Sequence, residues 1–113
     1  MIDWDRTAEL RSEIGAEDYS EVVAMFLDEM EEEMVSLRKV PAAEQLEGRL
    51  HFLKGSALNL GFSAFAALCQ AGETAAAKHD FDQIDLCDLA KVYDKSKSEF
   101  LARMPQELAA RCA

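Results

Sequence analysis

The chain has few residues that interrupt helices, with only 5 glycines and 2 prolines among its 113 residues. So little turn chemistry argues against folds built from many short strands and favours long helices. The apolar runs, such as residues 22–27, are far shorter than the roughly 20 residues that a membrane-spanning helix needs. Basic residues are also scarce, at 12 Lys and Arg against 22 Asp and Glu, which gives a formal net charge of -10. This balance argues against nucleic acid and anionic membranes as partners.

Cysteine is scarce as well. Cys69, Cys87 and Cys112 are odd in number, widely spaced and without a C-x-x-C motif. We therefore expect reduced thiols, the first two packed in the core, and no metal site built on them. Acidic residues at positions 3 and 5 replace the basic region of a secretory signal, so we expect none. These features are typical of a cytoplasmic protein.

The residues that are present indicate consecutive amphipathic helices in a single domain, residues 1–113, since 50% of the chain is hydrophobic. Apolar residues recur every three or four positions in five predicted helices. The first covers residues 4–14, the second begins after Asp18 and is ended by Pro41, and the others cover residues 41–60, residues 64–78 and the chain from about residue 83. The predicted N-caps are Asp3, Asp18, Ser63 and Asp82, and Pro105 is expected to kink or end the last helix. The predicted fold class is all-α, an antiparallel up-and-down four-helix bundle with a short additional N-terminal helix.

The predicted helix over residues 41–60 contains local choices that disfavour stability. Gly48 and Gly55 lie in its interior, and each costs roughly 0.5–1 kcal/mol relative to alanine. At about 100° per residue, one sector away from the leucine stripe groups His51, Lys54, Gly55 and Leu58. Such rule-breaking is typical of a functional site.

This sector has the chemistry of a docking site that accepts a phosphoryl group. A neutral imidazole, here that of His51, is a competent nucleophile, and Lys54 supplies a mobile positive charge for a phosphoryl oxygen. Gly55 leaves room for another protein's backbone, and Leu58 offers an exposed apolar contact. Each residue alone has an ordinary structural explanation, so the signal lies in their common position.

The stretch from His51 to Gly61, HFLKGSALNLG, resembles the signature of histidine-containing phosphotransfer (HPt) domains. That signature reads His, any residue, Leu, Lys, Gly, Ser and a small residue, with a Leu-Gly close. The resemblance implies a four-helix bundle in which His51 is phosphorylated on Nε2, Lys54 steadies the phosphoryl group and Gly55 admits the partner. Leu50 and Phe52 depart from the family's usual Ala and Thr, and Phe52, with Gly48, is expected at the docking surface.

The resemblance also implies supporting residues for the imidazole. Ser56 is expected to hydrogen-bond near the ring or, preferably, to the helix backbone. A polar residue of the fourth helix often faces the histidine in this family, and Gln70 and Glu73 are the candidates. Glu73 can orient the imidazole by accepting a hydrogen bond from Nδ1–H.

The implied reaction is reversible phosphoryl transfer between His51 and an aspartate of a response-regulator receiver domain. The expected partners are receiver domains and a hybrid sensor histidine kinase, with the protein as a cytoplasmic monomer. The chain itself is expected to need no cofactor, since Mg²⁺ would belong to the receiver.

Three alternatives remain open. An autophosphorylating kinase is disfavoured, because 113 residues leave no room for an ATP-binding domain and no Gly-rich nucleotide loop is present. A metal-binding bundle could use Glu47 and His51, four residues apart, but lacks the paired Glu-x-x-His motifs of such sites. The third is a pseudo-HPt bundle that binds a receiver or kinase without accepting phosphate, and the presence of both His51 and Lys54 argues against it.

Overall fold

The structure, a computed structural model, describes residues 1–39 and 42–112, and the side chains of residues 1–39 and 42–107. Within these ranges the chain is helical and contains no strand. The helices are α1 (Trp4–Ile14), α2 (Ala16–Arg38), α3 (Ala43–Leu60), α4 (Ser63–Ala77) and α5 (Leu86–Cys112), with a short 3₁₀ turn η1 (Phe81–Gln83) before α5. The predicted start of the third helix at Pro41 lies outside the described residues.

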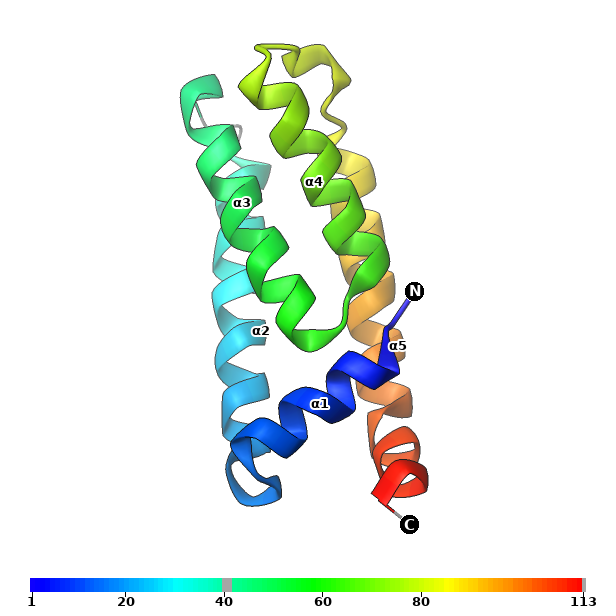
Figure 1. Cartoon of the computed structure of the whole chain (residues 1–113). Helices are drawn as coiled ribbons and strands as arrows, with labels where there is room; N and C mark the ends of the chain where they lie inside the picture. The colour runs from blue at the N-terminus through cyan, green and yellow to red at the C-terminus, as the bar shows by residue number, and fades with distance from the viewer. Residues whose placement is uncertain (40–41, 113) are drawn as a thin grey trace.

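Helices α2 to α5 lie side by side, and each runs in the opposite direction to the one before it (Figure 1). The short helix α1 crosses one end of this bundle, next to the turn that joins α3 to α4 (Figure 1). The all-α fold class is therefore confirmed. Short connections account for the alternating directions, because they leave a chain little choice but to return along its previous helix.

The core is formed by apolar stripes from all five helices. The stripe predicted for α3 is confirmed, since Leu50, Leu53, Ala57 and Leu60 are fully buried and Leu46 is 7% exposed. Aromatic ring pairs connect α5 to α1 and to α4. Trp4 of α1 stacks on Phe100 of α5 with ring centroids 5.9 Å apart, and Phe65 of α4 meets Tyr93 of α5 at 5.3 Å. With its leucines turned inward, α3 presents its opposite face to solvent.

The N-caps predicted from the sequence are confirmed only in part. Asp3 caps α1 as expected, since its side chain accepts from Arg6 N at 3.2 Å. The prediction for Asp18 is wrong, because α2 already begins at Ala16 and Asp18 lies in its first turn. There its negative charge still interacts favourably with the helix dipole, which explains why an acidic residue occurs at this point.

The predictions of Ser63 and Asp82 as N-caps are also wrong. Ser63 donates its hydroxyl to Met1 O at 2.9 Å, a contact with the N-terminal segment that local sequence does not reveal. Asp82 lies within η1, and Asp85 instead accepts from Asp88 N at 3.0 Å at the start of α5. Asp82 and Asp85 are chemically equivalent and three positions apart, so the tertiary path of the chain determines which of them caps α5.

In the C-terminal third, the predicted end of the last helix at Pro105 and the predicted burial of Cys87 are both wrong. Helix α5 continues through Pro105 to Cys112. Pro105 is exposed, so the carbonyl that loses its hydrogen-bond donor can be hydrated. Cys87 is exposed near the start of α5, whereas Cys69 is buried as expected.

Helix α1 is held by the turn between α3 and α4. Thr7 Oγ1 donates to Leu60 O at 2.8 Å, and Asp3 N donates to Gly61 O at 2.6 Å. Gly61 has a φ of 90°, and a Cβ at this position would lie 2.5 Å from Asp3 O. Glycine is therefore required both for the left-handed turn and for the close approach of α1.

We predict that Gly61→Ala destabilises the protein by about 2 kcal/mol or more, because a side chain there adds left-handed strain to a backbone clash. The measurement is the free energy of unfolding from chemical denaturation. The matched control is Gly48→Ala in α3, where a Cβ would meet nothing within 4 Å. That change should stabilise by about 0.5–1 kcal/mol. Equal effects at the two positions would contradict the role assigned to Gly61.

Candidate functional site

His51 lies at the middle of α3, on the face opposite the leucine stripe. Its side chain is 68% exposed, although Leu50 and Leu53 on either side are fully buried. This contrast follows from the helical period, since residues one and two positions away point to different sides of the helix. The imidazole is thus accessible to a second protein.

The ring is oriented by a carboxylate from the neighbouring helix. His51 Nδ1 lies 2.8 Å from Oε1 of Glu73 on α4. An ionised carboxylate can only accept a hydrogen bond, so Nδ1 must carry the proton. In the neutral ring the lone pair then resides on Nε2, the nitrogen that Glu73 does not contact.

Lys54 joins the same carboxylate one helical turn further along α3. Its Nζ lies 2.8 Å from Glu73 Oε2 and 2.9 Å from Gln70 Oε1, and Gln70 in turn donates to Thr74 Oγ1 at 3.0 Å. We refer to His51, Lys54, Gln70 and Glu73 as the acceptor cluster. Gln70 therefore holds the lysine, whereas Glu73 holds both the lysine and the imidazole.

The electrostatics of the cluster keep Glu73 charged. The hydrogen bond from Lys54 lowers the pKa of the Glu73 carboxyl below its ordinary value of 4.5. Partial burial opposes this effect, and the hydrogen bond from His51 adds to it. The carboxylate is therefore ionised at neutral pH, where it favours a protonated Nδ1 and balances the charge of Lys54.

A thiol lies beneath the cluster but is chemically inert there. Cys69 precedes Glu73 by one turn of α4 and is fully buried. Burial, reinforced by the negative charge of Glu73, raises the pKa of its thiol to about 12. A neutral, enclosed thiol does not compete with the exposed imidazole as a nucleophile.

Close packing of α3 against α4 brings the cluster together. Gly72 precedes Glu73, and a Cβ at Gly72 would lie 2.9 Å from Cδ1 of Leu50, the residue before His51. The missing side chain allows the two helices to approach at the level of the imidazole. Thr74 and Gly72 thus support the site, although the sequence reading assigned neither to it.

The surface around the imidazole is open on both sides. A Cβ at Gly48 or Gly55 would meet nothing within 4 Å, and Phe52 and Leu58 are 41% and 52% exposed. Leu58 and Lys54 line one hollow with residues of α4, while Gly48 and Phe52 line another facing α2. Ser56 lies apart from this surface, because it is only 5% exposed and belongs to the buried face of α3.

Within residues 1–39 and 42–112, none of the helices is both long and apolar enough to cross a membrane. Over the same part of the chain, no three His, Cys, Asp or Glu side chains come close enough to form a metal site.

Comparison with known proteins gives one match. A protein-family model described as "Hpt domain" matches residues 21–110, which covers α3, α4 and the whole acceptor cluster. No curated protein and no solved structure matches the chain.

We predict that Glu73 sets the tautomer of His51. At pH 8, where an imidazole is neutral, ¹⁵N NMR of the side chain should show the proton on Nδ1. Glu73→Leu should allow both tautomers, whereas the control Gln70→Leu, which removes contacts to Lys54 and Thr74 but none to the imidazole, should keep the proton on Nδ1.

The pH dependence of this network follows from the pKa of Glu73. Because that pKa is lowered on folding, the contribution of the carboxylate to stability is complete above about pH 4.5 and is lost as the pH falls through the lowered value.

For the tautomer experiment, a wild-type ring protonated mainly on Nε2 at pH 8 would contradict the assigned role of Glu73.

Proposed function

Because the chain belongs to the Hpt domain family, whose members act in phosphorelays, we propose that it reversibly carries a phosphoryl group on His51 between receiver-domain aspartates. The observation that carries this proposal is the 2.8 Å contact between Nδ1 of His51 and Oε1 of Glu73, made by a histidine whose side chain is 68% exposed. It leaves Nε2 as the nucleophilic nitrogen of an accessible ring.

In the proposed reaction, the Nε2 lone pair forms a bond to phosphorus as the bond between phosphorus and the receiver's aspartate oxygen breaks. The electron pair of the broken bond returns to that aspartate, and the proton on Nδ1 stays in place. The ring gains positive charge as the bond forms, and the carboxylate of Glu73 stabilises it. The reverse transfer uses the same contacts.

Lys54 is proposed to bind the phosphoryl group. An ammonium has three N–H donors. In the resting protein Gln70 accepts a hydrogen bond from Lys54 Nζ, and Glu73 Oε2 forms an ion pair with it at 2.8 Å. A remaining donor is assigned to a phosphoryl oxygen. Lys54 would then lie between two anions, the phosphoryl group and Glu73, and reduce the repulsion between them. Its side chain is 20% exposed, so its position is largely set before the partner arrives.

The proposed partners are receiver domains and a hybrid sensor histidine kinase, met by a monomer in the cytoplasm. Phosphoryl transfer of this kind depends mainly on positioning and charge neutralisation. The acceptor cluster contains one carboxylate, and Lys54 and His51 already occupy it. We therefore assign Mg²⁺ to the receiver.

We predict that His51→Gln abolishes acceptance of phosphate from a phosphorylated receiver domain. Its unfolding free energy should change by no more than about 0.5 kcal/mol, because the side chain is largely exposed. Lys54→Ala should slow transfer without abolishing it, since it removes charge stabilisation and leaves the nucleophile. The measurement is the transfer of ³²P from receiver domains of the same genome, with the acid-labile phosphate mapped by mass spectrometry.

The control for this experiment is His79→Gln, which changes the only other histidine and should leave transfer unchanged. Equal labelling of the His51→Gln protein would refute the assignment of the acceptor. Tight receiver binding without any labelling of the wild type would favour the pseudo-HPt alternative.

A further prediction tests whether Gly55 provides access. A Cβ at Gly55 meets no neighbour within 4 Å, so Gly55→Ala should stabilise the protein by about 0.5–1 kcal/mol. The same methyl group lies in the path of a docking receiver, so transfer from a receiver should be slower, and Gly55→Leu should slow it further.

Phosphoramidate, a small donor that needs no docking, separates the two effects. It should label His51 in both Gly55 variants at the wild-type rate. If both rates fall together, Gly55 acts on the imidazole and the access argument is wrong. If Gly55→Ala lowers the free energy of unfolding, the residue serves packing.

A further inference from the structure

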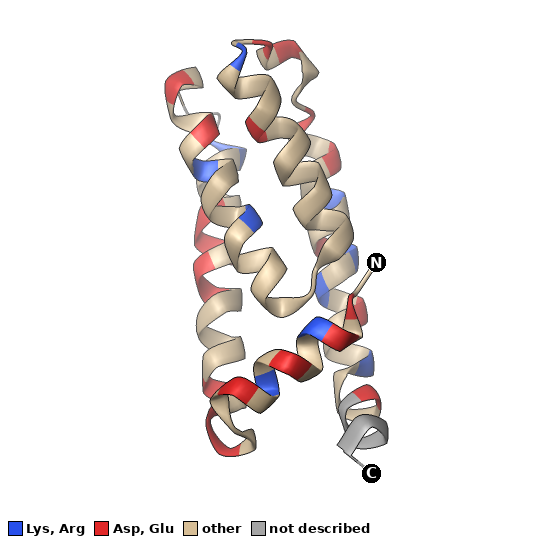
Figure 2. Cartoon of the chain, viewed as in Figure 1, with Lys and Arg blue, Asp and Glu red and all other residues tan. Residues whose placement is uncertain are grey.

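Helix α4 has few polar side chains, and Figure 2 shows how sparse charge is along it. Alanine is its commonest residue, and Glu73 is its only charged one. Apart from Ser63 at its start, the side chains that form strong hydrogen bonds are those of Gln70, Glu73 and Thr74. Because these residues stand at positions i, i+3 and i+4, they share one face of the helix. The polar residues of α4 are therefore gathered beside Lys54 of α3.

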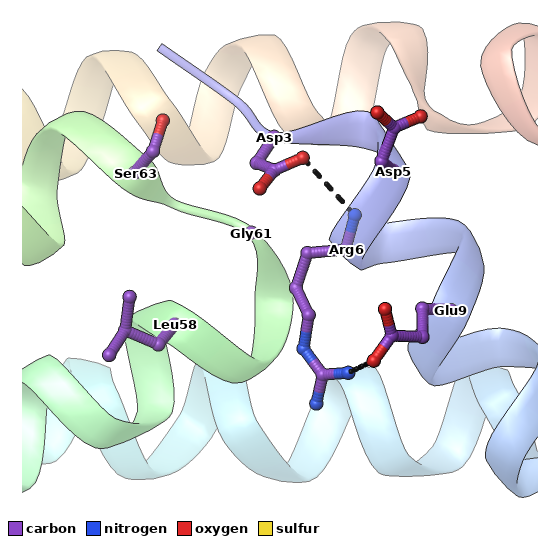
Figure 3. A pocket seen from close by; sticks show the side chains of 7 residues that line it. All are labelled: Asp3, Asp5, Arg6, Glu9, Leu58, Gly61 and Ser63. Carbon is purple, nitrogen blue, oxygen red and sulfur yellow. Dashed lines mark hydrogen bonds and ion pairs between the residues drawn. The ribbon is translucent and has the colours of Figure 1, made fainter.

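The backbones that carry these side chains are fixed relative to each other. Figure 3 shows α1 crossing the turn from α3 to α4, beside Gly61. Hydrogen bonds from Thr7 Oγ1 and Asp3 N hold this turn, at 2.8 and 2.6 Å. The long side chains of Lys54 and Gln70 are more flexible than this frame, so their positions depend on the contacts that they make themselves.

A chain of hydrogen bonds runs from Lys54 to Thr74. An ammonium only donates, so the atom of Gln70 that lies 2.9 Å from Lys54 Nζ is the amide oxygen, Oε1. The amide nitrogen of Gln70 then faces the other way and donates to Thr74 Oγ1 at 3.0 Å. The hydroxyl of Thr74 therefore holds the amide of Gln70, and the amide in turn holds the ammonium of Lys54.

This chain determines where the positive charge of Lys54 lies. Lysine has a compact charge on a flexible four-carbon stem, and its ion pair with Glu73 Oε2 at 2.8 Å is a single contact. One contact leaves the ammonium free to swing about the carboxylate, whereas a second contact, to Gln70, fixes it at one point. A charge stabilises a transition state most when it is already placed where the opposite charge develops.

Helix stability does not explain the threonine at position 74. Thr74 is exposed, and three alanines follow it at positions 75–77. Threonine has a lower helix propensity than alanine, because its branched side chain loses rotamer freedom against the preceding turn. Alanine would therefore suit the helix better, and a residue that lowers helix stability without a packing role indicates function.

We propose that Thr74 is a positioning residue for phosphoryl transfer, acting through Gln70 to hold Lys54 where negative charge develops on the phosphoryl group. This inference rests on the proposed function and adds to it a residue that takes no part in the bond changes. Thr74 acts only through the position of a charge, so its removal slows the reaction and does not abolish it.

Thr74→Val keeps the shape of the side chain and removes its hydroxyl. It should lower kcat for transfer from a phosphorylated receiver about threefold and leave KM unchanged, as expected for the loss of one neutral hydrogen bond. Labelling by phosphoramidate should fall by the same factor, because Lys54 serves both donors. Thr74→Ser restores the hydroxyl and should restore both rates. The control Ser98→Ala removes an exposed hydroxyl from α5 and should leave both rates unchanged.

A double variant tests whether Thr74 acts through Gln70. Gln70→Leu already removes the amide that holds Lys54, so adding Thr74→Val should slow transfer no further. ¹⁵N NMR of the Lys54 ammonium gives a readout that does not depend on transfer. Its protons should exchange with water faster in Thr74→Val and in Gln70→Leu than in the wild type, and at the wild-type rate in Thr74→Ser.

The outcomes separate this inference from the proposed function. Wild-type rates in Thr74→Val would overturn it, as would a failure of Thr74→Ser to restore them or a further loss in the double variant. A loss with the receiver but not with phosphoramidate would place Thr74 in a docking surface and overturn it as well. If no receiver phosphorylates the wild type, the proposed function fails, and the phosphoramidate rates still decide the role of Thr74. If phosphoramidate does not label the wild type either, both fail together.

Discussion

The site depends on one carboxylate that bridges two helices. Glu73 of α4 contacts both His51 and Lys54 of α3, each at 2.8 Å. Through one oxygen it fixes the ring proton on Nδ1, and through the other it holds the ammonium one turn away. Without this bridge, the exposed imidazole would be free to rotate and the lysine would be held by Gln70 alone, so the fixed pairing of imidazole and positive charge would be lost.

The position of the residues that Glu73 bridges depends on the two faces of α3. The leucine stripe is fully packed, and this packing holds the backbone from which the opposite face projects. That face keeps glycines at positions 48 and 55, where alanine would fit and would favour the helix. At Gly72 the absent side chain is instead needed for packing, because it lets α4 approach Leu50 beside the imidazole. Gly48 and Gly55 thus have open surroundings, which fit the proposed access for a partner, whereas Gly72 serves close contact between helices.

Errors in reading the sequence fall where local chemistry offers equivalent choices. Acidic and hydroxyl residues near helix starts predict caps at Asp18, Ser63 and Asp82. In the structure, however, α2 starts earlier, Ser63 bonds to the N-terminal segment, and Asp85 caps α5. Pro105 was expected to disturb α5, but on the exposed surface the lost hydrogen bond can be replaced by water. At the caps, equivalent side chains compete and tertiary contacts decide between them, whereas at Pro105 exposure to solvent decides.

The sequence by itself determined the all-α class, the buried stripe of α3 and the common sector of His51, Lys54, Gly55 and Leu58. These features follow from a helical period that acts over a few residues. Only the tertiary structure decided that Glu73 faces the imidazole while Gln70 faces Lys54, and that α1 lies beside Leu58. Residues 51 and 73 belong to different helices, so the distance between them depends on how closely α3 and α4 pack. That approach is set by side-chain volumes across the core, which no local pattern encodes.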